Sequence, residues 1–488
     1  MQIRVPEKWD MEYDVIVVGW GAAGSAAAVT AHDQGAQVLI LEKMPEGGGN
    51  TRVCGGNIII PKGKEFLNYL ETLSFQTTER EIIETFVEYA LKNGDWIRKM
   101  GADIQVFSPL EVAYPTMIGG AGFPHVPGAE TVVKYNIKGT PEEGKPSQRL
   151  WKFLSGLVAQ RKIKVLTSTP AKELIMAPDG EVAGVMAERE GKTFPIKARR
   201  AVILTCGGYE NDPRMKWDYL PVKPALFLGT PANTGDGIRM VQKIGGDLWH
   251  MTRLSCLIGF KAPEFEAAFW VAFLSEGFIF VDKYGRRFVN EAGIEIHEYY
   301  QELSRFDTEK MEFPRVPLWA IFDEQTRRRG PLSRGTAGYN RDLYSWSVDN
   351  SAEVAKGWIL QGKTVKELAA RISVDPAALE ESIARYNRHC QSGKDADFGR
   401  AKEDLRAMDP PLYAIQLWPA LINTQGGPRR DKESRVLDPE GRPIPRLYVA
   451  GELGSIWGYL YQGACNIGEG LVFGRIAGGN AAAEKPRS

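Results

Sequence analysis

The segment around residues 14–24 constrains the fold of this chain more than any other. A short apolar stretch, Asp14 to Val18, runs directly into Gly19-Trp20-Gly21-Ala22-Ala23-Gly24, which has the spacing G-x-G-x-x-G. A stretch of small residues follows, and a second apolar run, Gln37 to Leu41, ends at Glu42. In such a pattern the first glycine permits a tight turn, the second lets the backbone approach a pyrophosphate at a helix N-terminus, and the third lets helix and strand pack closely. The acid can accept hydrogen bonds from ribose hydroxyls. The sequence therefore predicts a dinucleotide-binding βαβ unit, with a plain βα turn as the alternative.

Length and composition narrow the class of protein. The 488 residues allow two domains, or one large domain with an insertion. Lys plus Arg and Asp plus Glu both number 61, so no charge imbalance indicates nucleic acid or a membrane surface as a partner. No apolar run has the length of a membrane span, and the N-terminus lacks the hydrophobic core of a signal peptide, so we expect a cytoplasmic protein. The five cysteines are scattered without C-x-x-C and the histidines are dispersed, so we expect no metal site.

The pattern of elements indicates an α/β fold interrupted by an insertion. In the first part we expect a helix from Thr78 with Glu81 completing a capping box, loops over 102–146, a helix over 147–160, strands at 164–167, 171–176 and 182–188, and a buried strand, 201–205, that enters a glycine turn. Aromatic residues and mixed polarity replace this alternation from about 247 to 400, where helices begin at Thr364 and Asp375. Strand-and-turn patterns then return, ending in a strand at 447–450 and a helix over about 468–484. We predict a Rossmann-like nucleotide-binding domain formed by residues 1–245 and 401–488, and an inserted α+β cap domain formed by residues 246–400.

Seven segments in one order along the chain resemble a known family. They are the G-x-G-x-x-G unit, Gly48 to Thr51, Ala201 to Tyr209, Thr234 to Gly237, Gly285 to Glu291 with the sequence G-R-R-F-V-N-E, Asp397 to Arg400, and Leu447 to Asn480. Together they resemble the flavoproteins of the fumarate reductase and 3-ketosteroid dehydrogenase superfamily. The resemblance implies FAD rather than NAD, placed between the nucleotide-binding domain and a cap that closes over the substrate. Covalently flavinylated relatives carry a histidine in the early region, and this chain has none there, so we predict non-covalent FAD.

The residues expected to hold FAD follow from the motifs and from the resemblance. Glu452 follows a strand, where parallel sheets bind ligands, and could hold ribityl hydroxyls; a surface acid is the alternative. Asn50 and Thr51 offer hydrogen bonds near the isoalloxazine, or simply form a turn. The N-terminus of the final helix can stabilise the negative charge of reduced flavin. The complete predicted set is Gly19, Gly21, Ala22, Ala23, Gly24, Glu42, Lys43, Gly49, Asn50, Thr51, Gly55, Gly56, Ala171, Cys206, Gly207, Asn233, Asp236, Gly451, Glu452, Asn466 and Ile467.

Three positions separate the two branches of the family. The fumarate reductase branch has a histidine before its Thr-x-Gly-Gly turn, an arginine four residues after the glutamate of R-F-x-N-E, and an arginine in a His-Gly-x-Asn-Arg stretch. This chain has Asn423, Glu295 and Tyr461 at those positions. Losing these basic groups removes the charge-assisted hydrogen bonds that would hold a dicarboxylate. The sequence therefore disfavours a small dianionic substrate.

The run Tyr461-Gln462-Gly463-Ala464-Cys465 resembles the Tyr-Pro-Gly-Ala-Gly run of the ketosteroid 1-dehydrogenases. In that family the tyrosine hydroxyl and the backbone N–H four residues later hold the substrate ketone. The resemblance implies that the Tyr461 hydroxyl and the Cys465 amide form an oxyanion hole, which stabilises the negative charge created when a proton leaves the carbon α to the ketone. The β-hydrogen would then leave as hydride to flavin N5. A side chain at position 465 narrows the pocket and disfavours a steroid-sized substrate, and a packed aromatic is the alternative role for Tyr461.

The resemblance also implies a proton acceptor from the cap. A cap tyrosine serves in the ketosteroid enzymes, and Tyr299 and Tyr300 follow the R-F-x-N-E motif at a comparable distance, with His297 close by. Tyr114 lies in an earlier loop where a supporting tyrosine could sit, and His125 is a further pocket candidate. A structural role is the alternative for each.

The predicted function is FAD-dependent α,β-dehydrogenation of a cyclic ketone or ketosteroid-like substrate. The alternative within the enzymes is a reductase or dehydrogenase of an unsaturated carboxylate, of the fumarate or tricarballylate type. A non-catalytic flavin-binding protein and a flavin monooxygenase are rivals of other classes. Because no C-x-x-C-H motif or additional FMN domain is evident, we expect electrons to pass to or from a separate quinone, electron carrier or oxygen.

Overall fold

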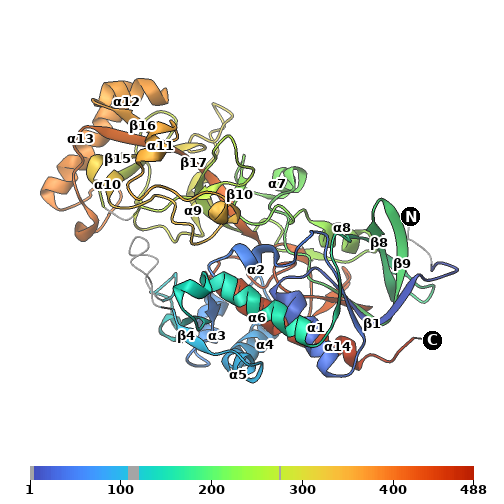
Figure 1. Ribbon diagram of the computed structural model, residues 1–488. Coiled ribbons are helices and arrows are strands. Elements are labelled where there is room, and N and C mark those ends of the chain that lie inside the picture. The colour runs from blue at the N-terminus through green and yellow to red at the C-terminus, as the bar shows by residue number, and fades with distance from the viewer. Residues whose placement is uncertain (1–4, 108–119, 274–275, 488) are drawn as a thin grey trace.

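The computed structural model describes residues 5–107, 120–273 and 276–487. Figure 1 shows an elongated molecule in which both described ends of the chain lie at one end and helices α12 (Val365–Ile372) and α13 (Pro376–Ser392) lie at the other. Two separate sheets account for the two halves of this shape. Tyr114, one of the predicted site residues, lies outside the described residues.

The first sheet is built around parallel strands. Its order is β19-β20-β9-β1-β2-β6, and β1 pairs in parallel with both β2 and β9. Strands β2 and β6 are also parallel, as are β20 and β9. Val15, Ile16 and Val17 of β1 are fully buried, which is the continuous apolar pattern of a strand covered on both faces. The strands span β1 Met11–Val18, β2 Val38–Leu41, β6 Lys164–Leu166, β7 Ala171–Met176, β8 Val182–Arg189, β9 Lys192–Leu204, β19 Arg435–Leu437 and β20 Pro443–Val449. Strands β7 and β8 extend β9 as an antiparallel hairpin.

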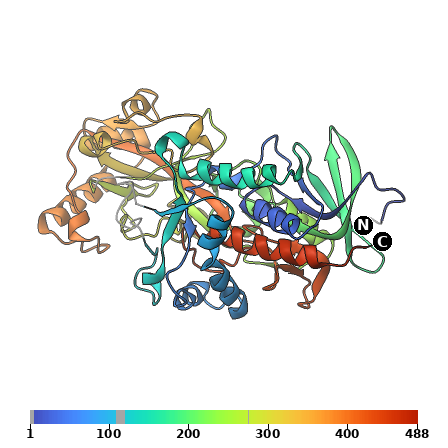
Figure 2. The ribbon, with the colours of Figure 1, turned by 60° about the horizontal axis from the view of Figure 1, so that its bottom comes forward.

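Two helices of small residues cover one face of this sheet and lie side by side (Figure 2). They are α1 (Ala22–Asp33) and α14 (Cys465–Ala483). Glycines recur every four residues along α14, and a Cβ atom at Gly474 would lie 2.5 Å from the Ala23 carbonyl oxygen, while one at Gly478 would lie 2.3 Å from that of Ala27. The absence of these side chains lets the two backbones touch, which fixes the N-terminal ends of both helices at one edge of the sheet.

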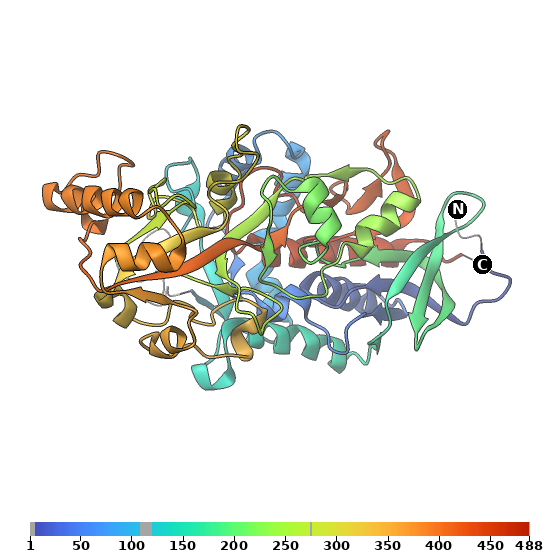
Figure 3. The same ribbon diagram turned by 90° about the horizontal axis from the view of Figure 1, so that it is seen from above.

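The second sheet is largely antiparallel and is organised by the long strand β17 (Leu412–Thr424). This strand pairs antiparallel with β12, β15 and β16, and in parallel with β10. Figure 3 shows β17 running from the far end of the molecule back toward the parallel sheet. The other strands span β10 Leu226–Phe227, β12 Leu254–Phe260, β13 Phe269–Trp270, β14 Phe278–Val281, β15 Leu318–Asp323 and β16 Leu360–Gly362. Since β17 ends where the parallel sheet presents its carboxyl ends, it brings the two sheets together.

Shorter elements surround the junction. A three-stranded sheet comprises β3 Ile58–Ile59, β4 Ile104–Val106 and β5 Lys134–Ile137, and β11 Leu248–Trp249 pairs with β18 Gly427–Pro428. The remaining α-helices are α2 Gly49–Val53, α3 Phe66–Ser74, α4 Arg80–Ala90, α5 Asn93–Lys99, α6 Pro146–Gln160, α7 Pro213–Tyr219, α8 Asp236–Lys243, α9 Tyr299–Leu303, α10 Glu324–Arg328 and α11 Ser351–Ala355. Single 3₁₀ turns occupy Ala129–Thr131, Pro141–Glu143, Tyr339–Asp342 and Lys402–Asp404. Among the helices that the structure describes, none combines the length and the apolar character that a membrane crossing needs.

The α/β class with a separate second sheet is confirmed, and several element predictions hold. Thr364 and Asp375 cap α12 and α13, with side-chain oxygens 3.1 Å from the Glu367 amide and 2.9 Å from the Ala377 amide. Two predictions are wrong. Residues 102–146 contain β4 and β5, and α4 begins at Arg80 because the Thr78 hydroxyl donates to the Ile456 carbonyl instead of capping a helix. The domain boundaries at 245 and 400 stay predictions, and β17 lies after the second of them.

Candidate active site

A cavity of about 620 Å³ lies where the carboxyl ends of the parallel strands meet the second sheet. Its wall is formed by the turns after β1, β2 and β9, by α2, by the end of β17, by the turn after β20 and by the loop that leads into α14. In open parallel sheets, ligands bind at this edge because the connections on either side diverge there. The cavity is therefore the place where the predicted site residues have to be tested.

The turn after β1 is packed so tightly that only glycine fits. Gly19 has φ of +101°, and a Cβ atom there would lie 2.4 Å from the Thr205 carbonyl oxygen. A Cβ at Gly24 would lie 2.2 Å from the Gly19 carbonyl oxygen, so Gly24 sets the contact between α1 and the turn, and it is not part of the cavity wall. The first amide of α1, from Ala22, donates to the Thr51 hydroxyl at 2.9 Å. Helix α1 thus directs its N-terminus toward the cavity, where a pyrophosphate is favoured by the amide donors and by the helix dipole.

Acidic and basic side chains border the cavity at the ends of β2 and α8. The buried Glu42 carboxylate accepts from the Trp20 amide at 2.9 Å and the Met44 amide at 2.8 Å, and its burial raises its pKa above the ordinary value. The Lys43 ammonium pairs with Asp236 at 2.6 Å. Burial by itself would raise the pKa of Asp236, but the interaction with this lysine opposes burial and the pKa lies below its ordinary value. These contacts hold the side chains beside the sheet edge.

A pair of carboxyl groups lies at the ends of the neighbouring strands β9 and β20. The Asn50 side-chain amide donates to Glu210 at 2.9 Å and to Glu452 at 3.1 Å, and the Asn233 amide donates to the same two groups at 3.0 Å and 3.5 Å. Burial, and then repulsion by Glu210, raise the pKa of Glu452 well above its ordinary value. Sequence reasoning missed Glu210, although the carboxyl ends of adjacent parallel strands must lie together and each of these strands is followed by a glycine and an acid.

Tyr461 lies in the cavity wall with only 5% of its surface exposed. Its hydroxyl oxygen accepts from the Asn466 amide, in the first turn of α14, at 3.3 Å, and its own amide donates to Glu298 at 3.0 Å. Its ring packs edge-on against His297 and Trp457, with centroids 5.2 Å and 5.5 Å away. Burial raises the pKa of the phenol well above its ordinary value, so the group keeps its proton and can donate it to an acceptor in the cavity.

The structure corrects the predicted role of Cys465. Its amide donates to the Gln462 carbonyl oxygen at 3.2 Å, and its side chain is fully buried outside the cavity wall. The cause is that α14 begins at Cys465, so the chain closes a turn there and uses the amide internally. The amide that contacts the Tyr461 hydroxyl belongs to Asn466, and it supports the phenol rather than facing a ligand beside it.

The predicted proton acceptors from the cap also need correction. Tyr299 and Tyr300 belong to the short helix α9 and pack into the hydrophobic core, and neither contributes to the cavity wall. His125 is exposed and likewise lies outside the wall. Helix α9 turns both tyrosines toward the core cluster that includes Phe280, whose ring centroid lies 6.2 Å from that of Tyr299.

This segment brings Ile296 and the ionisable His297 to the cavity wall. Nδ1 of His297 lies 2.8 Å and 3.1 Å from the two Glu295 carboxylate oxygens, and its amide donates to the same carboxylate at 2.7 Å. His297 is part of the cavity wall. The sequence analysis named His297 only as a neighbour of the tyrosines. The signal that could have identified it is Glu295, an acid two residues before the histidine.

Two further side chains shape this end of the cavity. Gln462 accepts from the Gly122 amide at 2.8 Å and from the Tyr69 hydroxyl, which ties α3 and the loop at Gly122 to the glycine-rich run before α14. Lys134, on β5, lies in the wall, and no hydrogen bond or ion pair of its ammonium occurs within the described residues. Burial lowers the pKa of this lysine. Lys145 and Arg334 also lie in the wall, so the cavity contains three cationic side chains that sequence reasoning did not anticipate.

Apart from Gly24, every residue of the predicted FAD set borders this one cavity. They are Gly19, Gly21, Ala22, Ala23, Glu42, Lys43, Gly49, Asn50, Thr51, Gly55, Gly56, Ala171, Cys206, Gly207, Asn233, Asp236, Gly451, Glu452, Asn466 and Ile467. The set is drawn from segments far apart in the chain, and its contact with FAD stays a prediction.

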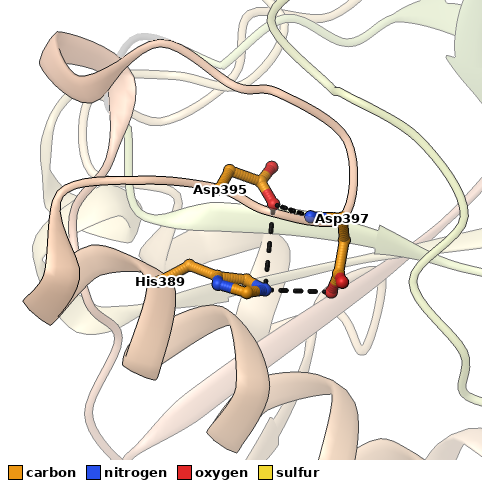
Figure 4. A group of neighbouring side chains, drawn as sticks. All are labelled: His389, Asp395 and Asp397. Carbon is orange, nitrogen blue, oxygen red and sulfur yellow. Dashed lines mark hydrogen bonds and ion pairs between the residues drawn. The ribbon is translucent and has the colours of Figure 1, made fainter.

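One group within the described residues has the side chains and spacing of a metal site, and it lies outside the cavity wall. The ligand atoms of His389, Asp395 and Asp397 lie within 4.8 Å of one another (Figure 4). Asp395 pairs with Arg287 at 2.9 Å, Asp397 pairs with Arg385, and the His389 Nε2 lies 3.0 Å from Asp397. Since arginines already compensate both carboxylates, we interpret the group as an ion-pair network that anchors the end of α13.

Comparison with known proteins agrees with this geometry. The model of the FAD binding domain family matches residues 14–467. The chain belongs to this family. It is similar to urocanate reductase of Eggerthella lenta, with 30% identity over 505 residues covering 98% of this chain and 76% of the relative. It is also similar to 3-oxosteroid 1-dehydrogenase of Mycolicibacterium smegmatis, with 28% identity covering 96% of both chains. Among solved structures it resembles 3-ketosteroid Δ1-dehydrogenase from Sterolibacterium denitrificans in complex with 1,4-androstadiene-3,17-dione, with a TM-score of 0.83 and 25% identity over 97% of this chain and 99% of that one.

Membership in the FAD binding domain family confirms the predicted superfamily, and with it an FAD-dependent oxidoreductase that acts on CH–CH bonds. The cavity suits that cofactor. The glycine turn after β1 leaves no room for a Cβ, the N-terminus of α1 faces the cavity, and polar groups at the ends of β2 and β20 are placed to meet hydroxyls. The relatives are divided between ketosteroid dehydrogenases and reductases of unsaturated acids, so the family leaves the substrate class open.

Proposed function

We propose that this flavoprotein catalyses the α,β-dehydrogenation of a cyclic ketone, steroid-like or smaller, with non-covalent FAD as the hydride acceptor. The observation that carries the proposal is the Tyr461 hydroxyl, which is buried in the cavity wall and accepts from the Asn466 amide at 3.3 Å. An oxygen that accepts a hydrogen bond becomes a stronger donor through its own proton. The phenol is therefore suited to hold a ketone oxygen as that oxygen gains negative charge.

The residues that replace the basic groups of the fumarate reductase branch support the same substrate class. Asn423 lies in the cavity wall as a neutral amide. The Glu295 carboxylate is hydrogen-bonded to Nδ1 of His297 at 2.8 Å. Tyr461 takes the third position with a neutral hydroxyl. Asn423 and Tyr461 can recognise a carbonyl oxygen through hydrogen bonds, and none of these three positions supplies a positive charge for a dicarboxylate.

The chain's own residues would act as follows. Bound FAD supplies a two-electron acceptor for the hydride that leaves the β-carbon. The Tyr461 hydroxyl holds the ketone oxygen and stabilises the negative charge that develops when the α-proton leaves, which is worth about 3 kcal/mol for one preorganised donor. The α14 amide of Asn466 fixes the phenol oxygen, and Glu298 fixes the Tyr461 backbone. The electrons then pass to a separate acceptor, a quinone, an electron carrier or oxygen.

A second candidate is supported by Lys134. Its ammonium, which has no hydrogen bond or ion pair among the described residues, could bind one substrate carboxylate from the cavity wall, which favours reduction of an unsaturated monocarboxylate. The similarity to a urocanate reductase points the same way. In this direction the same groups would work in reverse.

Anaerobic mixing of the yellow holoprotein with substrates separates the two candidates. We expect cyclic ketones with α- and β-hydrogens to bleach the visible flavin absorbance. A matched control is 3,3,5,5-tetramethylcyclohexanone, which has α-hydrogens but no β-hydrogen and should leave the flavin oxidised. If no ketone bleaches the flavin, while prereduced protein is reoxidised by an unsaturated carboxylate and Lys134→Met abolishes that reaction, the carboxylate assignment replaces the ketone assignment.

A further inference from the structure

We infer that His297, oriented by Glu295, is the group that takes the α-proton from the substrate. The inference rests on the proposed function, and it replaces the cap tyrosines, which pack into the core, with an imidazole in the cavity wall. A histidine–carboxylate pair borders the same cavity as Tyr461, and neither the motifs nor the family match gives this pair a role.

The geometry fixes which ring nitrogen is available. The Glu295 carboxylate lies 2.8 Å from Nδ1 of His297 and also accepts the His297 amide at 2.7 Å, so the acid holds both the backbone and the ring. A carboxylate at Nδ1 selects the tautomer in which that nitrogen carries the hydrogen, leaving Nε2 as a proton acceptor. Within the described residues, Nε2 has no hydrogen-bond partner. The side chain belongs to the cavity wall and keeps 16% of its surface accessible.

The imidazole is placed next to the proposed oxyanion donor. Its ring packs edge-on against the Tyr461 ring at 5.2 Å between centroids. It also lies directly on the loop that carries Tyr461, because a Cβ atom at Gly463 would lie 2.4 Å from the His297 Cε1. A substrate whose ketone oxygen meets the phenol therefore has its α-carbon in the neighbourhood of the imidazole. This adjacency is what an enolisation requires, since the proton leaves from the carbon next to the carbonyl.

The surrounding charges favour a base at this position. Among the described residues, the titratable groups near the pair include Tyr69 of α3, Lys134 of β5, Glu298 of the same segment, and Tyr461 and Cys465 of the loop and helix α14. Burial raises the pKa of Tyr69, Glu298, Tyr461 and Cys465, so these four groups stay neutral near neutral pH. Lys134 and Glu295 carry opposite charges, so their effects on the charged form of the imidazole oppose each other. The carboxylate at Nδ1 is thus the charge in direct contact with the ring, and it stabilises the imidazolium that forms.

The proposed reaction removes the α-proton first and the β-hydride second. The Cα–H bond breaks, its proton binds Nε2 of His297, and its electron pair forms the C=C bond of an enolate whose negative charge rests on the oxygen held by Tyr461. When the enolate reverts to C=O, the β-hydrogen leaves with its electron pair to FAD and the Cα=Cβ bond of the enone forms. The imidazolium then releases its proton to water. Glu295 touches no reacting atom and is a positioning residue.

The test follows proton removal without hydride transfer. Holoprotein with oxidised FAD is incubated in D₂O with 3,3,5,5-tetramethylcyclohexanone, and deuterium at the α-carbons is measured by mass spectrometry. We expect wild-type protein to catalyse the exchange, with a rate that rises with pH as the imidazole loses its proton. His297→Gln should slow exchange by about 100-fold or more, the usual contribution of a general base. The exposed His125→Gln is the matched control and should exchange at the wild-type rate.

Glu295→Gln supplies an independent readout. Removing the negative charge at Nδ1 destabilises the imidazolium, so the pH profile of exchange should move to lower pH and its plateau should fall about tenfold. A merely structural role for Glu295 would lower the rate without moving the profile. All variants are compared at equal FAD content with matching flavin circular dichroism.

The outcomes separate this inference from the proposed function. If dehydrogenatable ketones bleach the wild-type flavin, and His297→Gln both exchanges and bleaches at wild-type rates, the histidine assignment is wrong while the ketone assignment stands. An unshifted profile in Glu295→Gln also overturns the inference. If no ketone bleaches the wild-type flavin, the proposed function itself fails.

Discussion

Glu298 gives a prediction whose size can be worked from the structure. The residue is 6% exposed, and its carboxyl group accepts from the Tyr461 amide at 3.0 Å and from the Gln301 side-chain amide at 2.9 Å. Burial raises its pKa from 4.5 to about 8. The acid that positions the backbone of Tyr461 is therefore protonated in the folded protein near neutral pH and ionised in the unfolded chain.

The sign of the pH dependence follows from proton linkage. A raised carboxyl pKa contributes stability that is complete below pH 4.5 and is lost as the pH rises toward about 8. Between pH 5.5 and 7.5 the folded state holds one proton that the unfolded state lacks, so the free energy of unfolding falls by about 1.4 kcal/mol per pH unit, or about 3 kcal/mol across the window. Glu298→Gln keeps an acceptor for the Tyr461 amide and does not titrate.

The assay is urea unfolding at saturating FAD, at pH 5.5, 6.5 and 7.5, followed by tryptophan fluorescence. Relative to wild type, Glu298→Gln should gain about 3 kcal/mol between the lowest and the highest pH. Glu380→Gln, an exposed change on α13, should run parallel to wild type. A constant difference between Glu298→Gln and wild type across the window would refute the reasoning.

Three further predictions concern the helix pair and the cofactor. Gly474→Ala should lower the free energy of unfolding by about 1–3 kcal/mol, because its Cβ would lie 2.5 Å from the Ala23 carbonyl oxygen, while Gly479→Ala, which meets only a flexible side-chain end at 3.3 Å, should be neutral or stabilising in the same urea titration. Lys43→Met, which removes the 2.6 Å pair with Asp236, should weaken FAD binding by about 1 kcal/mol, roughly fivefold in fluorescence titration of apoprotein, and an unchanged Kd would contradict a role for this pair. Acid precipitation should leave the yellow colour in the supernatant, whereas colour that stays with the pellet would show covalent attachment.

The parallel half of the fold could be predicted from the sequence because its signals are local. Asp14 to Gly24 combines an apolar run, three glycines and small residues in one short window, and each reports on the backbone of its own segment. The caps at Thr364 and Asp375 are equally local. The prediction of loops over residues 102–146 was wrong for the opposite reason, because β4 and β5 are short strands whose partners are distant in sequence.

The site was predicted unevenly for a related reason. Tyr461 was found through a motif, whereas choosing among His297, Tyr299 and Tyr300 required the direction of each side chain. This segment passes from irregular backbone into the short helix α9, and no periodicity in the sequence states which residue faces the cavity. The predicted role of the Cys465 amide was wrong because the position at which α14 begins decides whether this amide is free to bind a substrate. To predict Glu210 as a site residue, one has to know that β9 and β20 are neighbouring strands.

The most direct test of the account is the rate of flavin reduction in Tyr461→Phe, measured by anaerobic stopped-flow with a ketone that bleaches the wild-type flavin. The change removes one hydroxyl that accepts from the Asn466 amide and leaves the ring packed against His297. We predict a 100- to 1,000-fold loss of rate, about 3–4 kcal/mol of transition-state stabilisation, with an unchanged Kd for FAD. A variant that reduces its flavin at the wild-type rate would contradict the claim that this phenol holds the reacting ketone.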